Sequence, residues 1–309
     1  LHVAKILLKK SNLRVGVPAT TYAATLWAIL QQGCQPVFYD INHKFVLDPV
    51  YVIPDHIDVL MPVDLCGYTA YDEDMIKHCQ EAGVFIIQDA CEAFGNKHAC
   101  YGDIICHSFY VSHHLTTGSG GMLSFNDKGI YDYIKSYIAH GRVYGGDFTK
   151  YQDKWYDRFL FDKVGVSLRN NNIAAAIGIT QLDNIEENNN KRKANALFYT
   201  NVFGSDSRFI IPNLDYIEKS VFQFYPILLN GSIDRTHFCE YLYDHGIESR
   251  VLFSLTNQPA LQSVFNQSRT AEAFPVSTFC NDNGVIIGCH QNLAVDNLER
   301  TCELIMSYH

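Results

Sequence analysis

The sequence predicts an α/β fold with a large lobe followed by a smaller one, and three observations lead to this prediction. The chain has 309 residues, and a domain usually has about 150, so two packed lobes are expected. Hydrophobic residues make up 47% of the chain and charged residues 18%, which supplies a large core and excludes wholesale disorder. Short β-rich runs alternate with amphipathic stretches, the pattern of a sheet covered by helices on both faces.

The larger lobe is predicted to span residues 1–200. Its expected strands are 15–18, 36–40, 59–63, 84–89, 103–110 and 121–125, and its expected helices lie at about 23–32, 74–82 and 128–139. A tract rich in Tyr, Trp, Asp and Gly and poor in periodicity, 141–163, is expected to form a surface loop or lid. A single long helix, 172–199, is then expected to bridge the two lobes.

The smaller lobe is predicted to span residues 201–309 as a second α/β unit. Its expected strands are 222–229, 249–253 and 284–288, and its expected helices are 235–245 and 295–308. In sheets of this class ligands collect where strands end and loops begin. Residues that follow the strands are therefore the first candidates for a functional site.

Composition and charge exclude several classes of function. The 24 basic and 33 acidic residues give a net charge of −9, which argues against nucleic acid and membrane partners because both are polyanionic. No apolar run approaches the roughly 18 residues that span a bilayer, and no signal peptide is recognisable, so a cytoplasmic location is expected. The ten cysteines include no C-x-x-C pair and are interpreted as reduced core thiols, with neither a metal site nor a disulfide framework. A small-molecule enzyme is favoured.

Two stretches carry residues that could perform chemistry. Asp89 follows four apolar positions, so its carboxylate is expected at the carboxyl end of a buried strand, although a lone aspartate there is more often a loop or capping residue. The stretch HSFYVSHHLTTGSGGMLSF, 107–125, joins hydroxyls and a glycine-rich turn that could present amides to a phosphate or could merely shape a turn. Adjacent His113 and His114 would point in opposite directions on an extended chain and would make a poor metal pair.

The order of longer motifs resembles one enzyme family. The motifs are VPATTYAATLWAILQQGCQPVFYDI, VFIIQDACEAFG, GDIICHSFYVSHHLTTGSGGMLSF, HGR at 140–142, VGVSLRNNNIAAAIGITQL and HGIESRVLF. Together they are similar to the sugar aminotransferases and dehydratases of the DegT/DnrJ/EryC1/StrS type, which use vitamin B6. The resemblance covers nearly all of the chain. It implies the aspartate-aminotransferase fold, fold type I, with a large mixed-sheet α/β domain and a smaller C-terminal domain.

The resemblance assigns a cofactor role to several positions. Asp89 matches the aspartate that pairs with the pyridine nitrogen, Tyr22 the aromatic residue that stacks on the ring, and Ser108 a hydroxyl that holds the phosphate. Glu92 lies where aminotransferases commonly have Gln, and an acid there looks more like the dehydratase branch. Ser167 takes the place of an Asn that reaches the phosphate of the neighbouring subunit.

Family members of this type are homodimers, so a homodimer is implied. Ser167 and Arg169 are the expected cross-subunit residues.

The main departure from the aminotransferase pattern is at His113. Aminotransferases carry the Schiff-base lysine there, and imidazole cannot form that bond. SFYVSHH is instead similar to the SFYPxHH pattern of the 3-dehydratases that act on nucleotide-linked 4-keto-6-deoxyhexoses. The stretch ESRVLFSLTNQPAL, 248–261, likewise resembles TRLLFAGNLTRQP of those enzymes, although it is shorter and lacks the second Arg. This similarity implies that Arg250, Phe253 and Gln258 contact the substrate.

The implied activity is removal of the 3-hydroxyl of such a sugar, of the GDP-4-keto-6-deoxymannose type, in deoxysugar biosynthesis such as that of lipopolysaccharide O-antigen. Pyridoxamine or pyridoxal phosphate would be the cofactor and glutamate the amino donor. A base with a pKa near 6.5 suits one proton removal at neutral pH, whereas a lysine would favour completed transamination. The branch that acts on CDP-linked sugars adds an iron–sulphur cluster, but no Cys lies between 106 and 239, so no cluster is expected.

Two alternatives stay open. The chain could be an aminotransferase of the same family that has lost its lysine. It could also be a degenerate sugar-nucleotide-binding or dimer-partner protein, because the family's Ser-Gly-Thr phosphate loop does not precede Val15 and fold alone does not establish activity. The first residue is Leu1, and the opening reads as the end of a helix, so we expect an N-terminal piece to be missing.

Overall fold

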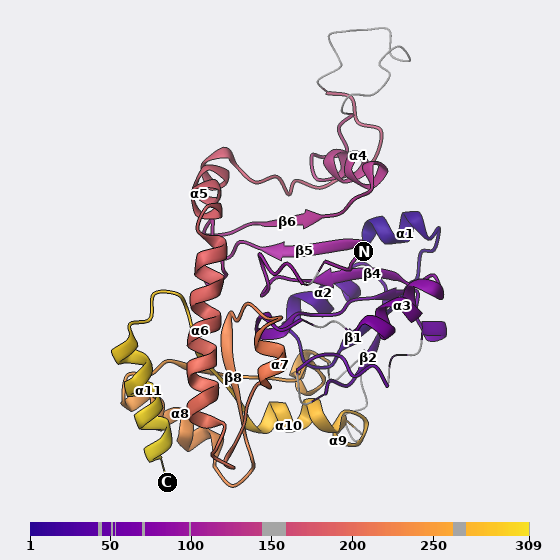
Figure 1. Ribbon diagram of the computed structural model, residues 1–309. Helices are drawn as coiled ribbons and strands as arrows, with labels where there is room; N and C mark the ends of the chain where they lie inside the picture. The colour runs from indigo at the N-terminus through magenta and orange to yellow at the C-terminus, as the bar shows by residue number, and fades with distance from the viewer. Residues whose placement is uncertain are drawn as a thin grey trace.

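The computed structural model describes residues 1–42, 45–50, 52, 54–69, 72–98, 100–143, 159–261 and 270–308. Two sheets organise these residues. The first has the strand order β2-β1-β3-β4-β5-β6 and the second the order β7-β8-β10-β9. Figure 1 shows the first sheet in the upper right of the molecule and the second in the lower left. The α/β class predicted from the sequence is confirmed.

The first sheet is mixed. Its strands are β1 (Arg14–Pro18), β2 (Gln35–Tyr39), β3 (Val59–Leu60), β4 (Phe85–Asp89), β5 (Ile104–Ser108) and β6 (Gly121–Ser124). All neighbouring pairs are parallel except β5 and β6, which are antiparallel. The connecting segments carry α1 (His2–Leu7), α2 (Ala23–Gln31), α3 (Glu73–Glu81), α4 (Lys128–Tyr137) and short 3₁₀ turns at Pro54–His56 and Leu65–Gly67. The buried apolar runs expected for parallel strands are present in β1, β3 and β4.

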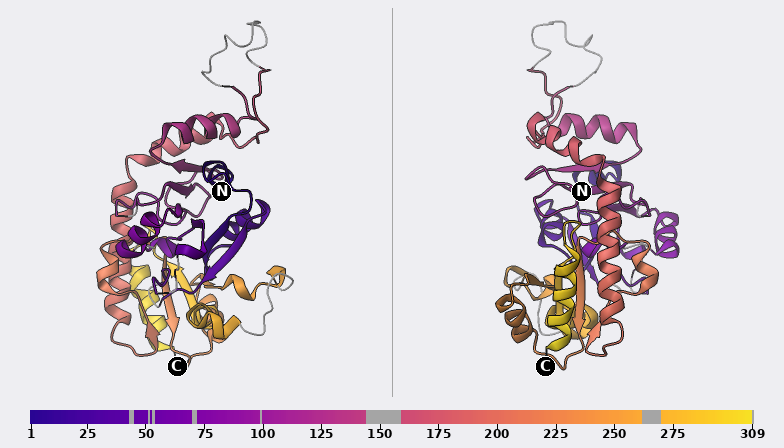
Figure 2. Two further views of the ribbon diagram at one scale, coloured as in Figure 1. Left: turned by 90° about the vertical axis from the view of Figure 1, so that its right-hand side faces the viewer. Right: turned by 60° about the vertical axis from the view of Figure 1, so that its left-hand side comes forward.

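The long helix predicted over 172–199 is two helices. These are α5 (Asn172–Leu182) and α6 (Ile185–Phe203), which meet at an angle in Figure 1. The break falls at Asp183 and Asn184, two poor helix formers, and Asn184 leaves the helical conformation with φ −102° and ψ 0°. Glu186 and Glu187 then occupy the first turn of α6, where acidic side chains stabilise the helix dipole. Helix α6 runs beside both sheets in the two views of Figure 2.

The second sheet is antiparallel. Its strands are β7 (Phe209–Ile210), β8 (Phe224–Leu229), β9 (Ser249–Val251) and β10 (Gly284–Gly288), accompanied by α7 (Leu214–Ile217), α8 (Arg235–Asp244), α9 (Thr270–Ala273), α10 (Pro275–Asn283) and α11 (Val295–Ser307). Short 3₁₀ turns lie at Leu255–Asn257 and Pro259–Leu261. Helix α10, which was not expected, begins with Pro275, a residue favoured at the first helical position.

The two sheets share buried contacts. One apolar cluster joins Val63 and Tyr68 from the first sheet's connections with Phe203, Phe222 and residues of the second sheet. Figure 2 shows the segments of the two sheets packed against one another. The boundary predicted at residue 200 lies inside α6, and the division of the chain at that point stays a prediction.

Three further expectations can be compared with the structure. Among the described helices, none combines the length and the apolar content needed to cross a bilayer. All ten cysteines are free thiols, and Cys34, Cys66, Cys79, Cys280, Cys289 and Cys302 are buried. Of the predicted loop over 141–163, residues 144–158 lie outside the described part of the chain.

Candidate functional site

Asp89 lies at the carboxyl end of β4. Its register partner on β5 is Cys106, and Ser108 ends β5 two residues further along. The Thr25 hydroxyl donates to Asp89 Oδ2 at 2.7 Å, and the Cys91 backbone N–H donates to Oδ1 at 3.2 Å. Since β4 and β5 are parallel, Asp89 and Ser108 lie at the same edge of the sheet. This is the edge where ligands bind in this class of fold.

Tyr22 and Ser108 flank this strand edge. Tyr22 is the residue before α2, one turn ahead of Thr25, and its side chain is 67% exposed. Ser108 Oγ accepts a hydrogen bond from the Tyr110 backbone at 3.3 Å. Helix α2 starts directly after β1, so the connection from β1 brings Tyr22 and Thr25 to the edge that carries Asp89.

The threonine hydroxyls of the glycine-rich turn after β5 donate hydrogen bonds to backbone carbonyls of the same segment. Thr116 Oγ1 donates to the Phe109 carbonyl, and Thr117 Oγ1 donates to the Ser119 carbonyl at 2.6 Å. Gly118 and Gly120 adopt positive φ angles of 78° and 130°, which favour glycine. Of the two interpretations that the sequence left open, these contacts favour glycines that shape the turn.

Glu92 is a partly buried carboxyl close to Asp89. Its Oε2 accepts from the Cys66 backbone N–H at 2.5 Å. Burial and the negative charge of Asp89 raise the pKa of Glu92 to about 7, although the hydrogen bond from Cys66 opposes that rise. Glu92 can therefore exchange a proton near neutral pH, which a glutamine at this position could not do.

His113 lies in the loop after β5. Its Nδ1 is 2.7 Å from Gln223 Oε1, and its backbone N–H donates to the Tyr110 carbonyl. Burial lowers the pKa of His113, and the charge of Arg192 lowers it as well, while the Gln223 hydrogen bond, the Asp89 carboxylate and the Cys91 backbone raise it. An imidazole with a lowered pKa is neutral at pH 7 and can accept a proton.

His114 has a different environment. It is 5% exposed, its Nε2 lies 3.1 Å from the Val221 carbonyl, and its Nδ1 is buried with no hydrogen-bond partner. Burial lowers the pKa of His114 to about 3, so this imidazole stays neutral across the neutral range. Residues 110–114 form turns and bends rather than the extended chain that would point the two histidine rings in opposite directions. Both rings contact the segment 221–223 instead.

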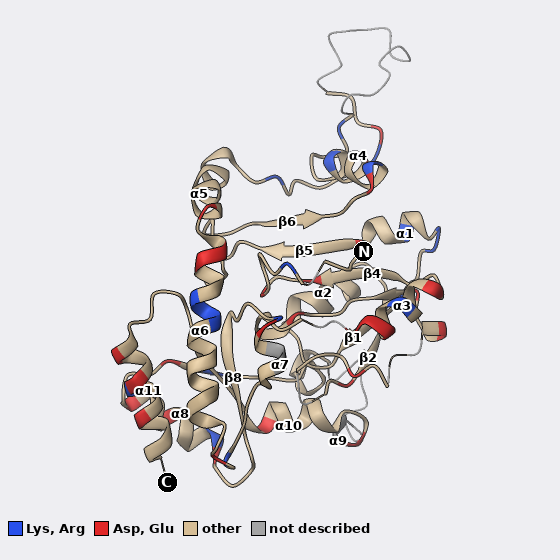
Figure 3. Cartoon of the chain, in the orientation of Figure 1, with Lys and Arg blue, Asp and Glu red and all other residues tan. Residues whose placement is uncertain are grey.

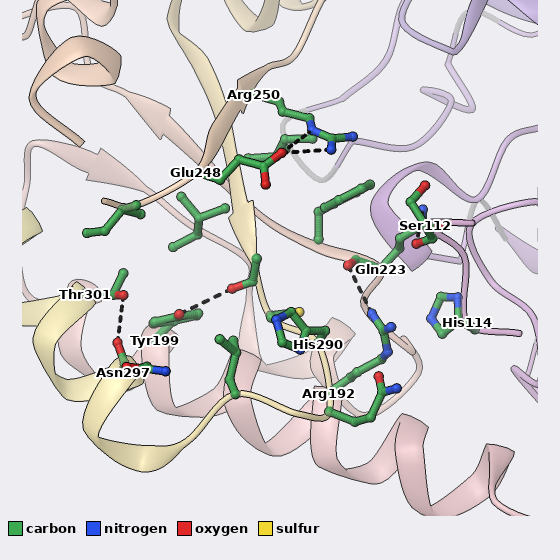
Figure 4. A pocket seen from close by; sticks show the side chains of 18 of the residues that line it. Ser112, His114, Arg192, Tyr199, Gln223, Glu248, Arg250, His290, Asn297 and Thr301 are labelled. Atoms are coloured by element: carbon green, nitrogen blue, oxygen red, sulfur yellow. Dashed lines mark hydrogen bonds and ion pairs between the residues drawn. The ribbon is translucent and has the colours of Figure 1, made fainter. Parts of the chain in front are cut away.

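A cavity of about 590 Å³ opens beside His113. Its walls come from the loop 111–116, from α6, from β9 and β10, and from the start of α11. Figure 4 shows Gln223 with Ser112 on one side and Arg192 on the other, and Glu248 paired with Arg250 across the cavity. The Arg250 guanidinium bonds Glu248 at 2.8 Å and lies 5.7 Å from the centre of the Phe224 ring.

The predicted site residues are distributed unevenly. Of the described residues that line the cavity, His113 and Arg250 belong to the predicted set, whereas Tyr22, Asp89, Glu92 and Ser108 lie at the adjoining strand edge. Their individual roles stay predictions.

The other predicted residues lie elsewhere. Phe253 is partly buried in the apolar cluster under the first sheet, and Gln258 Nε2 donates to the Ser254 carbonyl within its own turn. Ser167 and Arg169 are exposed, and Ser167 pairs with Ala139 in an isolated bridge. Within the described chain these four residues do not line the cavity.

Sequence reasoning missed Gln223 and Arg192. Gln223 precedes β8 in the run FQFYPILL and is 3% exposed, and a lone amide in an apolar run was the signal that could have indicated it. Arg192 is buried in α6, where Nη1 donates to the carbonyls of Phe222 and Gln223. Its position in an Asn- and Lys-rich helix gave no such signal.

Comparison with known proteins identifies the family. The profile of the DegT/DnrJ/EryC1/StrS aminotransferase family matches residues 3–306. The chain belongs to this family.

Relatives of this chain include a synthase of an amino sugar and a 3-dehydratase. GDP-perosamine synthase of Escherichia coli O157:H7 is 27% identical over 322 residues, covering 100% of this chain and 83% of the relative. GDP-4-keto-6-deoxy-D-mannose 3-dehydratase of Escherichia coli O55:H7 is 26% identical over 332 residues, covering 98% and 83%. A solved Escherichia coli GDP-4-keto-6-deoxy-D-mannose-3-dehydratase with bound hydrated PLP superposes with a TM-score of 0.82 at 21% identity, covering 96% and 80%.

These comparisons confirm the predicted family and fold. Sugar-nucleotide aminotransferases and 3-dehydratases both occur among the relatives of this chain, and the names alone do not choose between the two activities.

Proposed function

We propose that this chain is a 3-dehydratase of a nucleotide-linked 4-keto-6-deoxyhexose that uses pyridoxamine phosphate. The observation that carries the proposal is His113: an imidazole stands where the family's aminotransferases have a lysine, and it borders a cavity of about 590 Å³. The charge of Asp89 acts on this imidazole, so the histidine and the strand edge belong to one electrostatic environment.

The residues at the strand edge fit a pyridine cofactor. Asp89 offers a carboxylate that accepts two hydrogen bonds, Tyr22 an exposed aromatic face, and Ser108 a hydroxyl, all at one edge. When bound, such a cofactor supplies a protonated ring that accepts an electron pair from the reacting carbon. Asp89 would hold the proton on the ring nitrogen by its charge. Pyridoxal phosphate would bind the same groups.

His113 would remove one proton through Nε2. Its Nδ1 faces Gln223, and its lowered pKa leaves the ring neutral at pH 7. Imidazole cannot form the covalent bond to the cofactor by which a lysine would release an amino sugar, so completed amino transfer is disfavoured. Arg250 would contact the substrate from the cavity wall, with Phe253 and Gln258 as weaker candidates because their side chains are packed elsewhere.

We also propose a homodimer. Helix α5 exposes Ile173 at 76% and Ile179 at 65%, and it carries no charged side chain, as Figure 3 shows. Exposed apolar faces of this kind mark interfaces. Ser167 and Arg169 precede this helix and are exposed, which suits residues that reach into a partner's site. Sedimentation velocity of the purified chain tests this: a dimer is expected, and a monomer would remove the cross-subunit roles.

We place the enzyme in the cytoplasm, in a pathway for deoxysugars of a surface polysaccharide such as O-antigen, with glutamate restoring the amine. The ten free thiols support a reducing compartment. The absence of cysteine between 106 and 239 supports a reaction without an iron–sulphur cluster.

A second candidate is a sugar-nucleotide aminotransferase. The GDP-perosamine synthase relative favours it, since that protein is as similar to this chain as the dehydratase relative is. The absence of the lysine argues against it.

One experiment separates the candidates. The protein is incubated with glutamate, pyridoxamine phosphate and a panel of 4-keto-6-deoxy sugar nucleotides, and the molecular masses of the products are measured by mass spectrometry. Loss of one oxygen atom from the sugar together with release of ammonia is expected, because the cofactor amine ends as the aldehyde, whereas an amino sugar that keeps its 3-hydroxyl would establish the aminotransferase. No turnover together with no change in cofactor absorbance would indicate a binding or dimer-partner protein.

A further inference from the structure

Gln223 joins the two sheets at the candidate site. It is 3% exposed and directly precedes β8. Its Oε1 lies 2.7 Å from His113 Nδ1, and its Nε2 lies 3.2 Å from the Ser112 carbonyl oxygen. One amide group therefore contacts two consecutive residues of the loop after β5, from 110 residues away in the sequence.

The orientation of this amide follows from donor and acceptor chemistry. A backbone carbonyl only accepts hydrogen bonds, so the NH₂ end of Gln223 must face Ser112. The carbonyl end then faces His113, and because Oε1 only accepts, the Nδ1 of His113 must donate. In a neutral imidazole a proton on Nδ1 leaves a free electron pair on Nε2.

The backbone around Gln223 is fixed from three sides. Its N–H donates to the Cys66 carbonyl at 3.0 Å, and the neighbouring Val221 N–H donates to the Gly67 carbonyl at 3.1 Å. Its own carbonyl accepts from Arg192 Nη1 at 3.2 Å. A side chain on so constrained a segment has little freedom to turn away, and Figure 4 shows it between Ser112 and Arg192.

We propose that Gln223 is the positioning residue for His113: it holds the ring in the Nδ1–H tautomer and so presents Nε2 as the proton acceptor. The role of Nε2 as a base rests on the proposed function, whereas the tautomer itself does not.

The groups that act on this imidazole come from several elements. Asp89 of β4 and the Cys91 backbone favour the charged ring, and Arg192 of α6 disfavours it, as does burial. His114 is neutral and adds no charge. The short contact to Gln223 is thus one of several influences on the proton affinity of His113, but it is the one that selects which nitrogen carries the proton.

Nitrogen-15 NMR of histidine-labelled full-length protein, recorded without cofactor or substrate, tests the proposal. A His113→Asn spectrum assigns the His113 signals among those of the 13 histidines. In the unchanged protein the Nδ1–H tautomer is expected. In Gln223→Leu, loss of one hydrogen bond should shift the tautomer ratio by about fivefold to tenfold toward Nε2–H.

Two further variants keep the test decisive. Gln223→Glu retains the acceptor and adds a negative charge, so it should preserve the Nδ1–H tautomer and raise the pKa of His113 by about one unit. Gln181→Leu is the matched control: Gln181 clamps the same loop through both Thr116 backbone groups without contacting His113, so its loss should leave the tautomer unchanged.

The proposal is overturned if His113 gives equal signals in the unchanged protein, in Gln223→Leu and in Gln223→Glu. An Nε2–H ring in the unchanged protein would also overturn it. Should the NMR result hold while no sugar nucleotide is dehydrated, the positioning role stands and the proposed function fails. If Gln223→Leu does not fold, the Gln223→Glu spectrum decides: an Nδ1–H ring supports the proposal, and an Nε2–H ring overturns it.

Discussion

Two regions of the candidate site contrast in how they are held. The carboxylate region consists of Asp89 and Glu92 at the end of β4, and the imidazole region consists of His113 and His114 after β5. The hydrogen-bond partners of the carboxylates come from the first sheet and its connections, namely Thr25, Cys91 and Cys66. Those of the imidazoles, Gln223 and Val221, come from the segment that enters β8 of the second sheet.

This difference teaches that the two halves of the site depend on different parts of the fold. The hydrogen bonds to the carboxylates come from the first sheet and its connections, whereas the imidazole region is oriented only when the second sheet packs against it. Burial acts on both regions in the same sense, toward neutral groups: it raises the pKa of Glu92 to about 7 and lowers that of His114 to about 3.

The largest expected effect comes from removing the base in the imidazole region. His113→Ala should slow loss of the 3-hydroxyl by about 10²–10⁴-fold, the usual contribution of a general base. Cofactor binding should survive because the carboxylate region is untouched, which absorbance in the cofactor band measures. Retained dehydration in this variant would remove His113 from its role, and exposed His98→Ala serves as the control.

The same region predicts a pH profile. A protonated imidazole cannot take a proton, so the rate should fall as the pH drops through the pKa of His113. That pKa is lowered below 6.5, so the acid limb should lie below pH 6.5. The limb should be absent from the residual rate of His113→Ala, and an acid limb above pH 7 would contradict the assignment.

The next prediction concerns the packing at the junction of the two regions, where Gly67 lies. Gly67 has φ +85°, and an added Cβ would lie 2.8 Å from Phe222 N and 2.9 Å from both Gln223 N and Glu92 O. Gly67→Ala should therefore lower the free energy of unfolding by about 2–5 kcal/mol, from left-handed strain plus overpacking. Urea denaturation measures it.

Gly83→Ala is the matched control, since Gly83 has φ +74° with nothing within 4 Å of an added Cβ. It should cost about 1–2 kcal/mol, the strain alone. Equal losses in the two variants would show that the junction is not tightly packed.

The stability of the protein should depend on pH through Glu92 of the carboxylate region. Its pKa is raised from 4.5 to about 7, so folding takes up protons between these values, and its effect is to make the protein less stable as pH rises through that window. Glu92→Gln should remove this slope and be more stable than the unchanged protein at pH 8 by at most about 3 kcal/mol, with little difference at pH 4.5.

Unfolding free energies at several pH values measure the difference between the two proteins. Exposed Glu187→Gln, which should not change with pH in this way, is the control. A difference that is constant from pH 4.5 to 8 would exclude a raised pKa for Glu92.

The smallest expected effect concerns the support of Asp89. Thr25→Val removes the hydroxyl that donates to the carboxylate and should lower the free energy of unfolding by about 1–3 kcal/mol, the range for a bond to a charged group. Thr20→Val is the control, because the Thr20 hydroxyl is buried without a hydrogen-bond partner, so its loss should be neutral or stabilising. If the two variants lose equal stability, the Thr25 contact is not a specific support.

Much of the carboxylate region could be predicted from the sequence. An apolar run that ends in Asp89 specifies a buried strand with a carboxylate at its end, and periodicity is a local property. The strand at 103–110 was predicted two residues too long, since β5 ends at Ser108, and the helix over 172–199 was predicted as one because its break depends on two residues alone.

The sequence by itself determined the α/β class, the family through its ordered motifs, and the histidine at position 113, because each depends on residues near one another in the chain. Only the tertiary structure decided what holds that histidine. The contact between His113 and Gln223 joins residues 110 positions apart, and it exists because the second sheet packs onto the loop after β5. Such a contact is fixed by how elements meet in space, which no local pattern of residues records.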